Sequence, residues 1–149
     1  MSFSPSRRFV AASWLVVAAW AGFIFFASAH TGSDFNNAQD FLTQLKKWVD
    51  ALLAEWNIPG LKESSSLGHF CEYAVFDVLL ANALRCHMPW QKACLVAVAV
   101  ASGYGVTDEF HQLFVPGRAC DPLDWVVDTC GAALGSFLCF LVLRHGSRV

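Results

Sequence analysis

The chain has 149 residues, of which 56% are hydrophobic and only 15% are charged. Soluble domains are roughly 45–50% apolar, so this composition excludes an ordinary water-soluble domain and favours one small membrane bundle. The formal net charge of −2 argues against a nucleic-acid partner, because binding to phosphates needs a basic surface.

Residues 9–30 are the first candidate for a membrane-spanning helix. Between Phe9 and Gly32 the only ionisable side chain is His30, and about 20 apolar residues suffice to cross a bilayer. Ala27-Ser28-Ala29 also resembles a signal-peptidase site, so a cleaved secretory signal peptide is the alternative. The apolar run is longer than the roughly 7–15 residues of a signal-peptide core, which favours an uncleaved transmembrane helix.

Residues 35–57 differ from the spans, because apolar and charged residues alternate there at helical spacing. Phe41, Leu45 and Trp48 fall on one face of such a helix, and charged residues such as Asp50 occupy the others. The mixed charge lacks the basic face that attracts anionic lipids. We therefore predict an amphipathic helix that lies outside the membrane and packs onto the other helices.

Residues 67–85 are apolar enough for a second span but carry His69, Glu72 and Asp77 within the apolar run. His69, Glu72 and Tyr73 share one helical face by their spacing, and Asp77 points elsewhere, toward the other half of the membrane. Ionisable side chains inside a membrane are costly and mark functional sites by default. A histidine one turn from a glutamate therefore makes this face a candidate site.

The third predicted span, residues 92–113, is rich in small residues, which permit close approach of neighbouring helices. It ends in a run of polar side chains. On a helix, Asp108 shares a face with His111 and Gln112. The same helical geometry predicts that Glu109 points away from them.

The fourth predicted span covers residues 122–143. Asp121 precedes Pro122, a pattern typical of a helix N-cap followed by proline at the first helical position. Asp128 lies a full turn beyond Asp124 and is too deep to act as a cap. Asp124, Asp128 and the glycines of the run Gly131-Ala-Ala-Leu-Gly135 share one face, which we predict is the packed face.

Basic residues indicate the orientation of the four predicted spans. Val115-Pro116-Gly117-Arg118 has the residues of a tight turn. Other basic residues fall at helix ends that four spans would bring to one side, which the positive-inside rule assigns to the cytoplasm: Arg7, Arg8, Arg85, Lys92, Arg144 and Arg148. We therefore expect both termini in the cytoplasm and the segment 34–66 and the turn at Arg118 outside.

The six cysteines contain no C-x-x-C pair, and most lie in apolar runs, so we interpret them as small buried hydrophobic residues. No cofactor is predicted. His69, Glu72, Asp108 and His111 leave room for a divalent metal, but their spacing matches no standard metal motif.

Two motifs make the chain resemble the VanZ-like family of small bacterial membrane proteins. One is D-E-x-H-Q-x-x-x-P-G-R with an aspartate six residues later, met by Asp108, Glu109, His111, Gln112, Pro116, Gly117, Arg118 and Asp124. The other is H-F-x-x-Y, met by His69, Phe70 and Tyr73. Ser66 stands where family members often carry lysine, and Asp128 where they often carry asparagine. The resemblance implies a link to teicoplanin resistance.

These observations predict an all-α fold: one domain over residues 1–149, with four transmembrane helices and an extracytoplasmic amphipathic helix between the first and second. In this topology most of the polar side chains approach the outer face of the membrane together. The candidate site residues are His69, Glu72, Tyr73, Asp108, Glu109, His111, Gln112, Arg118, Asp124 and Asp128.

Several functions are compatible with this site. We favour binding or modulation of an envelope lipid or lipid-linked peptidoglycan precursor, with no nucleic-acid partner. An enzyme acting on such a substrate is the first alternative, with Glu72 or Asp108 as general base and Arg118 binding a phosphate or carboxylate. A proton pathway through Asp77 and Asp128 is the second. A purely structural network, in which Arg118 pairs with Asp124 or Glu72, is the third.

Overall fold

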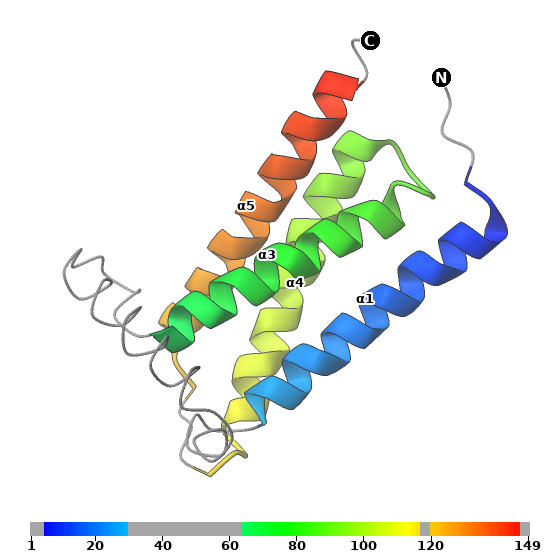
Figure 1. Ribbon diagram of the computed structural model, residues 1–149. Helices are drawn as coiled ribbons and strands as arrows, with labels where there is room; N and C mark the ends of the chain where they lie inside the picture. The colour runs from blue at the N-terminus through cyan, green and yellow to red at the C-terminus, as the bar shows by residue number, and fades with distance from the viewer. Residues whose placement is uncertain (1–4, 30–63, 117–119, 147–149) are drawn as a thin grey trace, which may run out of the picture.

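The computed structural model describes residues 5–29, 64–116 and 120–146. In this part of the chain every regular element is a helix: α1 (Arg7–Ser28), α3 (Ser64–Leu84), α4 (Trp90–Gln112) and α5 (Pro122–Gly146) (Figure 1). All four are long and apolar enough to cross a membrane. The prediction of an all-α bundle with four membrane-spanning helices is confirmed. The predicted amphipathic helix over residues 35–57 lies outside the described residues, as does Arg118.

The helix starts follow from local capping. Ser6 caps α1, because its hydroxyl accepts a hydrogen bond from the Phe9 N–H at 3.2 Å. Asp121 acts in the same way before α5, where its Oδ1 accepts from the Leu123 N–H at 2.9 Å. This contact confirms the predicted N-cap, and Pro122 occupies the first helical position, where the missing N–H costs nothing.

The closest helix contact joins α3 to α5. A Cβ added to Gly131 would collide with the carbonyl oxygen of Phe70, and one added to Gly135 would lie 2.5 Å from that of Ala74. Four residues further along α5, from Gly131 to Gly135, the contact on α3 also moves forward by four residues, from Phe70 to Ala74. The two helices therefore run parallel where they touch. The Gly131–Gly135 face is the packed face, as its spacing predicts.

Helix α4 packs antiparallel against both. The Ser102 and Thr129 hydroxyls are 2.9 Å apart, and the Trp125 indole N–H donates to the Ser102 carbonyl at 3.1 Å. Further along, the Ser136 hydroxyl lies 2.7 Å from Asp77 Oδ2 and 2.9 Å from the Cys94 carbonyl oxygen. Asp77 is therefore held in the interior by Ser136, and no hydrogen bond among the described residues links it to the histidine and acids described below.

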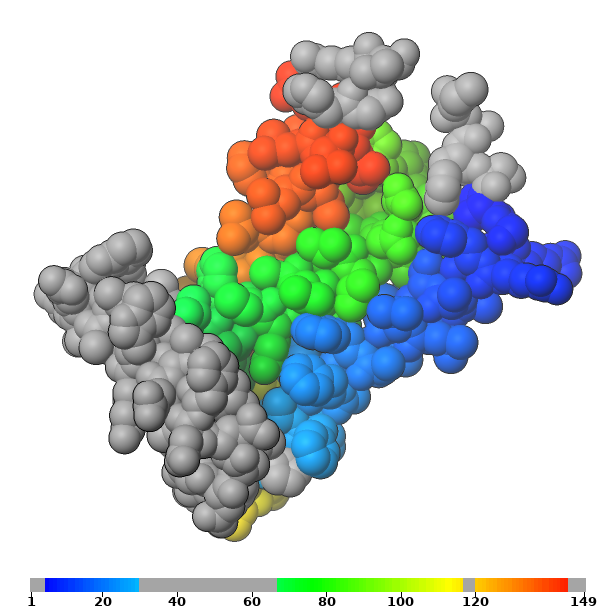
Figure 2. Space-filling view, viewed as in Figure 1, coloured from blue at the N-terminus to red at the C-terminus, as the bar shows by residue number. Residues whose placement is uncertain are grey.

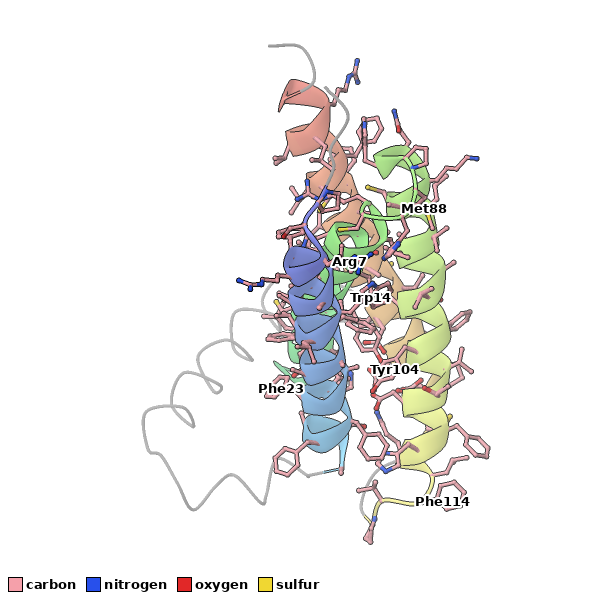
Figure 3. All side chains as sticks on the ribbon, turned by 90° about the vertical axis from the view of Figure 1, so that its right-hand side faces the viewer. Arg7, Trp14, Phe23, Met88, Tyr104 and Phe114 are labelled. Atoms are coloured by element: carbon pink, nitrogen blue, oxygen red, sulfur yellow. The ribbon has the colours of Figure 1, made fainter. Side chains whose placement is uncertain are left out.

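Helix α1 lies along α3 and α4 and is joined to both by hydrogen bonds from aromatic side chains. The Trp20 indole donates to the Glu72 carbonyl at 3.0 Å, and the Tyr104 hydroxyl donates to the Ala21 carbonyl at 2.7 Å. Figure 3 shows Tyr104 on α4 beside α1. Ile24 has no exposed surface. The first apolar segment is thus a packed member of the bundle, as expected for a transmembrane helix.

The two ends of the bundle differ. We call "polar end" the end where α1 and α4 finish and α3 and α5 begin, and "basic end" the opposite one, which holds Arg85, Lys92 and Arg144 (Figure 1).

The interpretation of all cysteines as buried is wrong: among them only Cys94 is buried, and Cys71, Cys120 and Cys130 are exposed. Exposing a thiol on a lipid-facing helix surface costs no hydrophobic free energy, because the surrounding lipid is itself apolar.

Candidate functional site

Three helices bring polar side chains together at the polar end. His69 and Tyr73 come from α3, Asp108 and Gln112 from α4, and Asp128 from α5, and all five are buried. Tyr73 and Asp128 have no exposed surface at all. We call these five residues the polar cluster. The structure therefore assembles half of the ten predicted site residues into one buried group.

The centre of the cluster is an ion pair between α3 and α5. His69 Nδ1 lies 3.4 Å from Asp128 Oδ1, which is within ion-pair distance, although the geometry is not that of a hydrogen bond. Gly105 makes room for this pair on α4. A Cβ at this position would lie 3.3 Å from Asp128 Oδ2 and 3.5 Å from the Tyr73 ring.

Glu109 is buried beside the cluster, so the prediction that it points away is wrong. Its Oε2 accepts from the backbone N–H of Asp121 at 2.8 Å, and its Oε1 accepts from the Gln112 amide at 3.2 Å. The first N–H groups of a helix have no partner within it and carry partial positive charge. The start of α5 supplies such a donor on that side of α4, which draws the Glu109 carboxylate inward.

The Gln112 amide connects the two acids of α4. Its Nε2 also lies 3.5 Å from Asp108 Oδ2, a long contact that leaves Asp108 weakly held. One amide serves both carboxylates, so Gln112 holds the two acids of α4 in place, including Glu109, whose other oxygen meets the Asp121 N–H before α5. Its role is that of a positioning residue.

His111 does not join the cluster. Its ring packs on Phe25 of α1, with ring centroids 4.1 Å apart. His111 therefore closes the α1–α4 contact at the polar end, and we assign it to the wall of the site. The apolar partner in α1 explains the difference, since helical spacing alone cannot show which neighbour a shared face meets.

Glu72 and Asp124 are half-buried at the rim of the cluster. Glu72 lies within electrostatic range of His69, and Asp124 within range of Asp128. The pairing of Arg118 with either acid stays a prediction, because Arg118 lies outside the described residues.

The cluster contains hydrogen-bonding atoms that the protein leaves unused. Asp128 has no hydrogen-bond partner for either carboxylate oxygen, and Asp108 has none for Oδ1. The Tyr73 hydroxyl, 0% exposed as a residue, is also without one. Buried polar atoms are nearly always hydrogen-bonded, because leaving a buried donor or acceptor without a hydrogen bond costs about 1–3 kcal/mol. The polar cluster therefore keeps unused hydrogen-bonding atoms on three helices, on Tyr73 of α3, Asp108 of α4 and Asp128 of α5.

Sequence reasoning missed three contributors. Ser28, only 2% exposed, presents an unpartnered hydroxyl at the end of α1. Gly105 admits the Asp128 carboxylate, and Trp125 packs beside it. The small-residue run of α4 indicated close packing but could not single out Gly105. The only feature of the sequence that drew attention to Ser28 was its place in Ala27-Ser28-Ala29, which resembles a signal-peptidase site.

The described residues contain no group of three or more His, Cys, Asp or Glu side chains placed to hold a metal ion.

Comparison with known proteins adds a family to this geometry. The sequence profile described as VanZ/LLP1 matches residues 13–143, which include α3 and α4 in full, most of α1 and α5, and every residue of the polar cluster. No curated protein matches the chain, and no solved structure matches it. The profile covers nearly the whole chain, and the protein is a multi-pass membrane protein of the VanZ/LLP1 family.

Proposed function

We propose that this protein acts at the outer leaflet of the bacterial inner membrane, where it binds the headgroup of an envelope lipid or lipid-linked peptidoglycan precursor. The polar cluster receives the headgroup, and the apolar helices leave the lipid chains in the bilayer. By holding such a molecule the protein modulates the envelope, and low-level tolerance of teicoplanin is one outcome of that modulation.

The observation that carries this proposal is the set of unused acceptors on Asp108 and Asp128. A buried carboxylate oxygen without a donor is expensive, so Asp108 Oδ1 and both oxygens of Asp128 need hydrogen-bond donors that the described residues do not provide. A headgroup rich in N–H or O–H donors is such a partner. Ammonium, hydroxyl and amide groups of envelope lipids and precursors all meet this requirement.

The proposal predicts a loss of function from a change that keeps shape. In Asp108→Asn, one acceptor oxygen becomes a donor amide, so a donor-rich headgroup loses its partner while the volume stays the same. Cells that produce this variant should resist teicoplanin less well than cells that produce the wild type at equal protein level.

Thr107→Val is the matched control for this assay. Thr107 is the neighbouring residue on the exposed side of α4, where its hydroxyl donates to the Tyr104 carbonyl at 2.7 Å. This variant should behave like the wild type. Equal tolerance in cells producing Asp108→Asn would remove glycopeptide tolerance from the proposal.

An enzyme on the same substrate is the second candidate, and the His69–Asp128 pair is the observation that favours it. When the ring is neutral and its proton is on Nδ1, facing the Asp128 carboxylate, the other nitrogen can take a proton from water or a hydroxyl, and the imidazolium that results forms the ion pair with Asp128. Turnover of a lipid-linked precursor by purified protein, lost in His69→Gln with binding retained, would establish this candidate over simple binding.

The proposed orientation has a direct test. Reporter fusions after Lys62 and Arg118 should be extracytoplasmic, whereas fusions after His87 and Val149 should be cytoplasmic, because basic residues stay on the cytoplasmic side. The polar end then faces the outer leaflet. An extracytoplasmic reporter after His87 would reverse the orientation and move the site to the inner leaflet.

A further inference from the structure

We propose a second lipid site at the basic end, in which α3 and α5 bind an anionic glycerophospholipid. The site is a groove of about 410 Å³ between the C-terminal halves of these helices. Val78, Leu79 and Arg85 line it from α3, and Leu138, Cys139 and Val142 line it from α5. We call it the α3–α5 groove. It lies at the opposite end from the polar cluster and does not depend on the function proposed for that cluster.

The groove follows from how the two helices cross. Gly131 and Gly135 bring α5 against the backbone of α3 at Phe70 and Ala74. Beyond this contact α5 carries large side chains such as Leu138 and Val142, so the helices diverge toward the basic end (Figure 1). Figure 2 shows the green atoms of α3 and the orange-red atoms of α5 side by side on one face. A volume of about 300–1,000 Å³ is typical of small-molecule sites.

The walls of the groove suit an acyl chain. Leu138 is 50% exposed and Val142 70% exposed, so the groove opens at the lipid-facing surface of the bundle. Most of its lining is aliphatic, and the polar lining residues Asn82 and Arg85 lie together near the end of α3. Asn82 also donates to Ser13 of α1 at 3.3 Å, which fixes its position.

The charge at the end of the groove selects the headgroup. Arg85 directly follows α3 and lines the groove at the basic end of the bundle, so acyl chains that fill the groove would leave the phosphate of their lipid beside Arg85. A guanidinium binds phosphate oxygens through paired, charge-assisted hydrogen bonds. The described residues that line the groove include no acidic side chain. In a zwitterionic headgroup the attached cation offsets the phosphate charge beside Arg85, whereas a net-anionic headgroup leaves that charge uncompensated and so attracts the guanidinium more strongly.

The test uses delipidated full-length protein titrated with phosphatidylglycerol or phosphatidylcholine of identical acyl chains, with bound lipid counted by native mass spectrometry. The wild type should bind phosphatidylglycerol about fivefold more tightly, because roughly 1 kcal/mol of attraction between Arg85 and the net negative charge is not offset by a choline cation. Arg85→Gln should lose this preference. Arg144→Gln removes an exposed charge of the same end that does not line the groove, and it should keep most of the preference.

A second pair of variants tests the groove itself. Val142→Trp fills the groove from α5 and should weaken binding of both lipids. Val106→Trp adds the same side chain at a position on α4 that is 53% exposed and outside the groove, and should leave binding unchanged. Equal binding of the two lipids by the wild type, or a preference that survives Arg85→Gln, would overturn the proposal. Should Val142→Trp fail to fold, the comparison of Arg85→Gln with Arg144→Gln alone tests the proposal.

Discussion

Gly131→Ala is expected to prevent assembly of the bundle, whereas Gly103→Ala should leave it intact. The new methyl group would collide with the Phe70 carbonyl, which belongs to the backbone and cannot rotate away. The two helices would have to separate and would lose the hydrogen bonds that depend on their contact. Overpacking typically costs about 1–3 kcal/mol, and a clash with backbone belongs at or above the top of that range.

Gly103 is the matched control, since a Cβ there would meet nothing within 4 Å. Alanine also favours a helix over glycine by about 1 kcal/mol, so this variant should be as stable as the wild type or slightly more so. The measurement is the yield of monodisperse protein in detergent together with its midpoint of thermal unfolding. Wild-type yield and midpoint for Gly131→Ala would show that α3 and α5 are not in contact there.

His69→Leu should be the most destabilising single change in the polar cluster. It leaves Asp128, which is 0% exposed, with no ion-pair partner among the described residues. Breaking a buried ion pair from one side typically costs about 3–5 kcal/mol, because the remaining charge is uncompensated. The loss should appear as a lower free energy of unfolding in detergent.

The double variant His69→Leu, Asp128→Leu should recover much of this loss, because apolar residues of similar volume often replace a buried pair without cost. If the double variant recovers stability, its binding can be measured on a folded protein, and the structural role of the pair is separated from its role in binding. A double variant that folds but no longer binds envelope amphiphiles assigns the pair to the site. Full retention of binding would instead reduce His69 and Asp128 to structural residues.

The sequence predicts the membrane helices well because a bilayer imposes a length and an apolar composition that can be read locally. The contact at Gly131 and Gly135 and the cap at Asp121 were also predictable, since both depend on spacing within one helix. The gathering of His69, Asp108 and Asp128 followed from the topology, which brings the corresponding helix ends to one side.

Contacts that depend on a neighbouring helix were not predictable in the same way. Glu109 turns inward because the first N–H groups of α5 come to lie beside it, and His111 turns to Phe25 because α1 lies there. Neither neighbour is visible in the spacing of α4. The α3–α5 groove likewise results from a crossing of two helices and has no signature in either one.

Binding of a donor-rich headgroup by the polar cluster is tested most directly by identifying the amphiphiles that copurify with the protein. Native mass spectrometry of the wild type should find a lipid or lipid-linked precursor that carries N–H or O–H donors. Asp128→Asn, which keeps the volume but removes an acceptor, should lose that molecule and keep any phospholipid bound in the α3–α5 groove. The same set of bound molecules in both proteins, or none specific to the wild type, would contradict headgroup binding at the polar cluster.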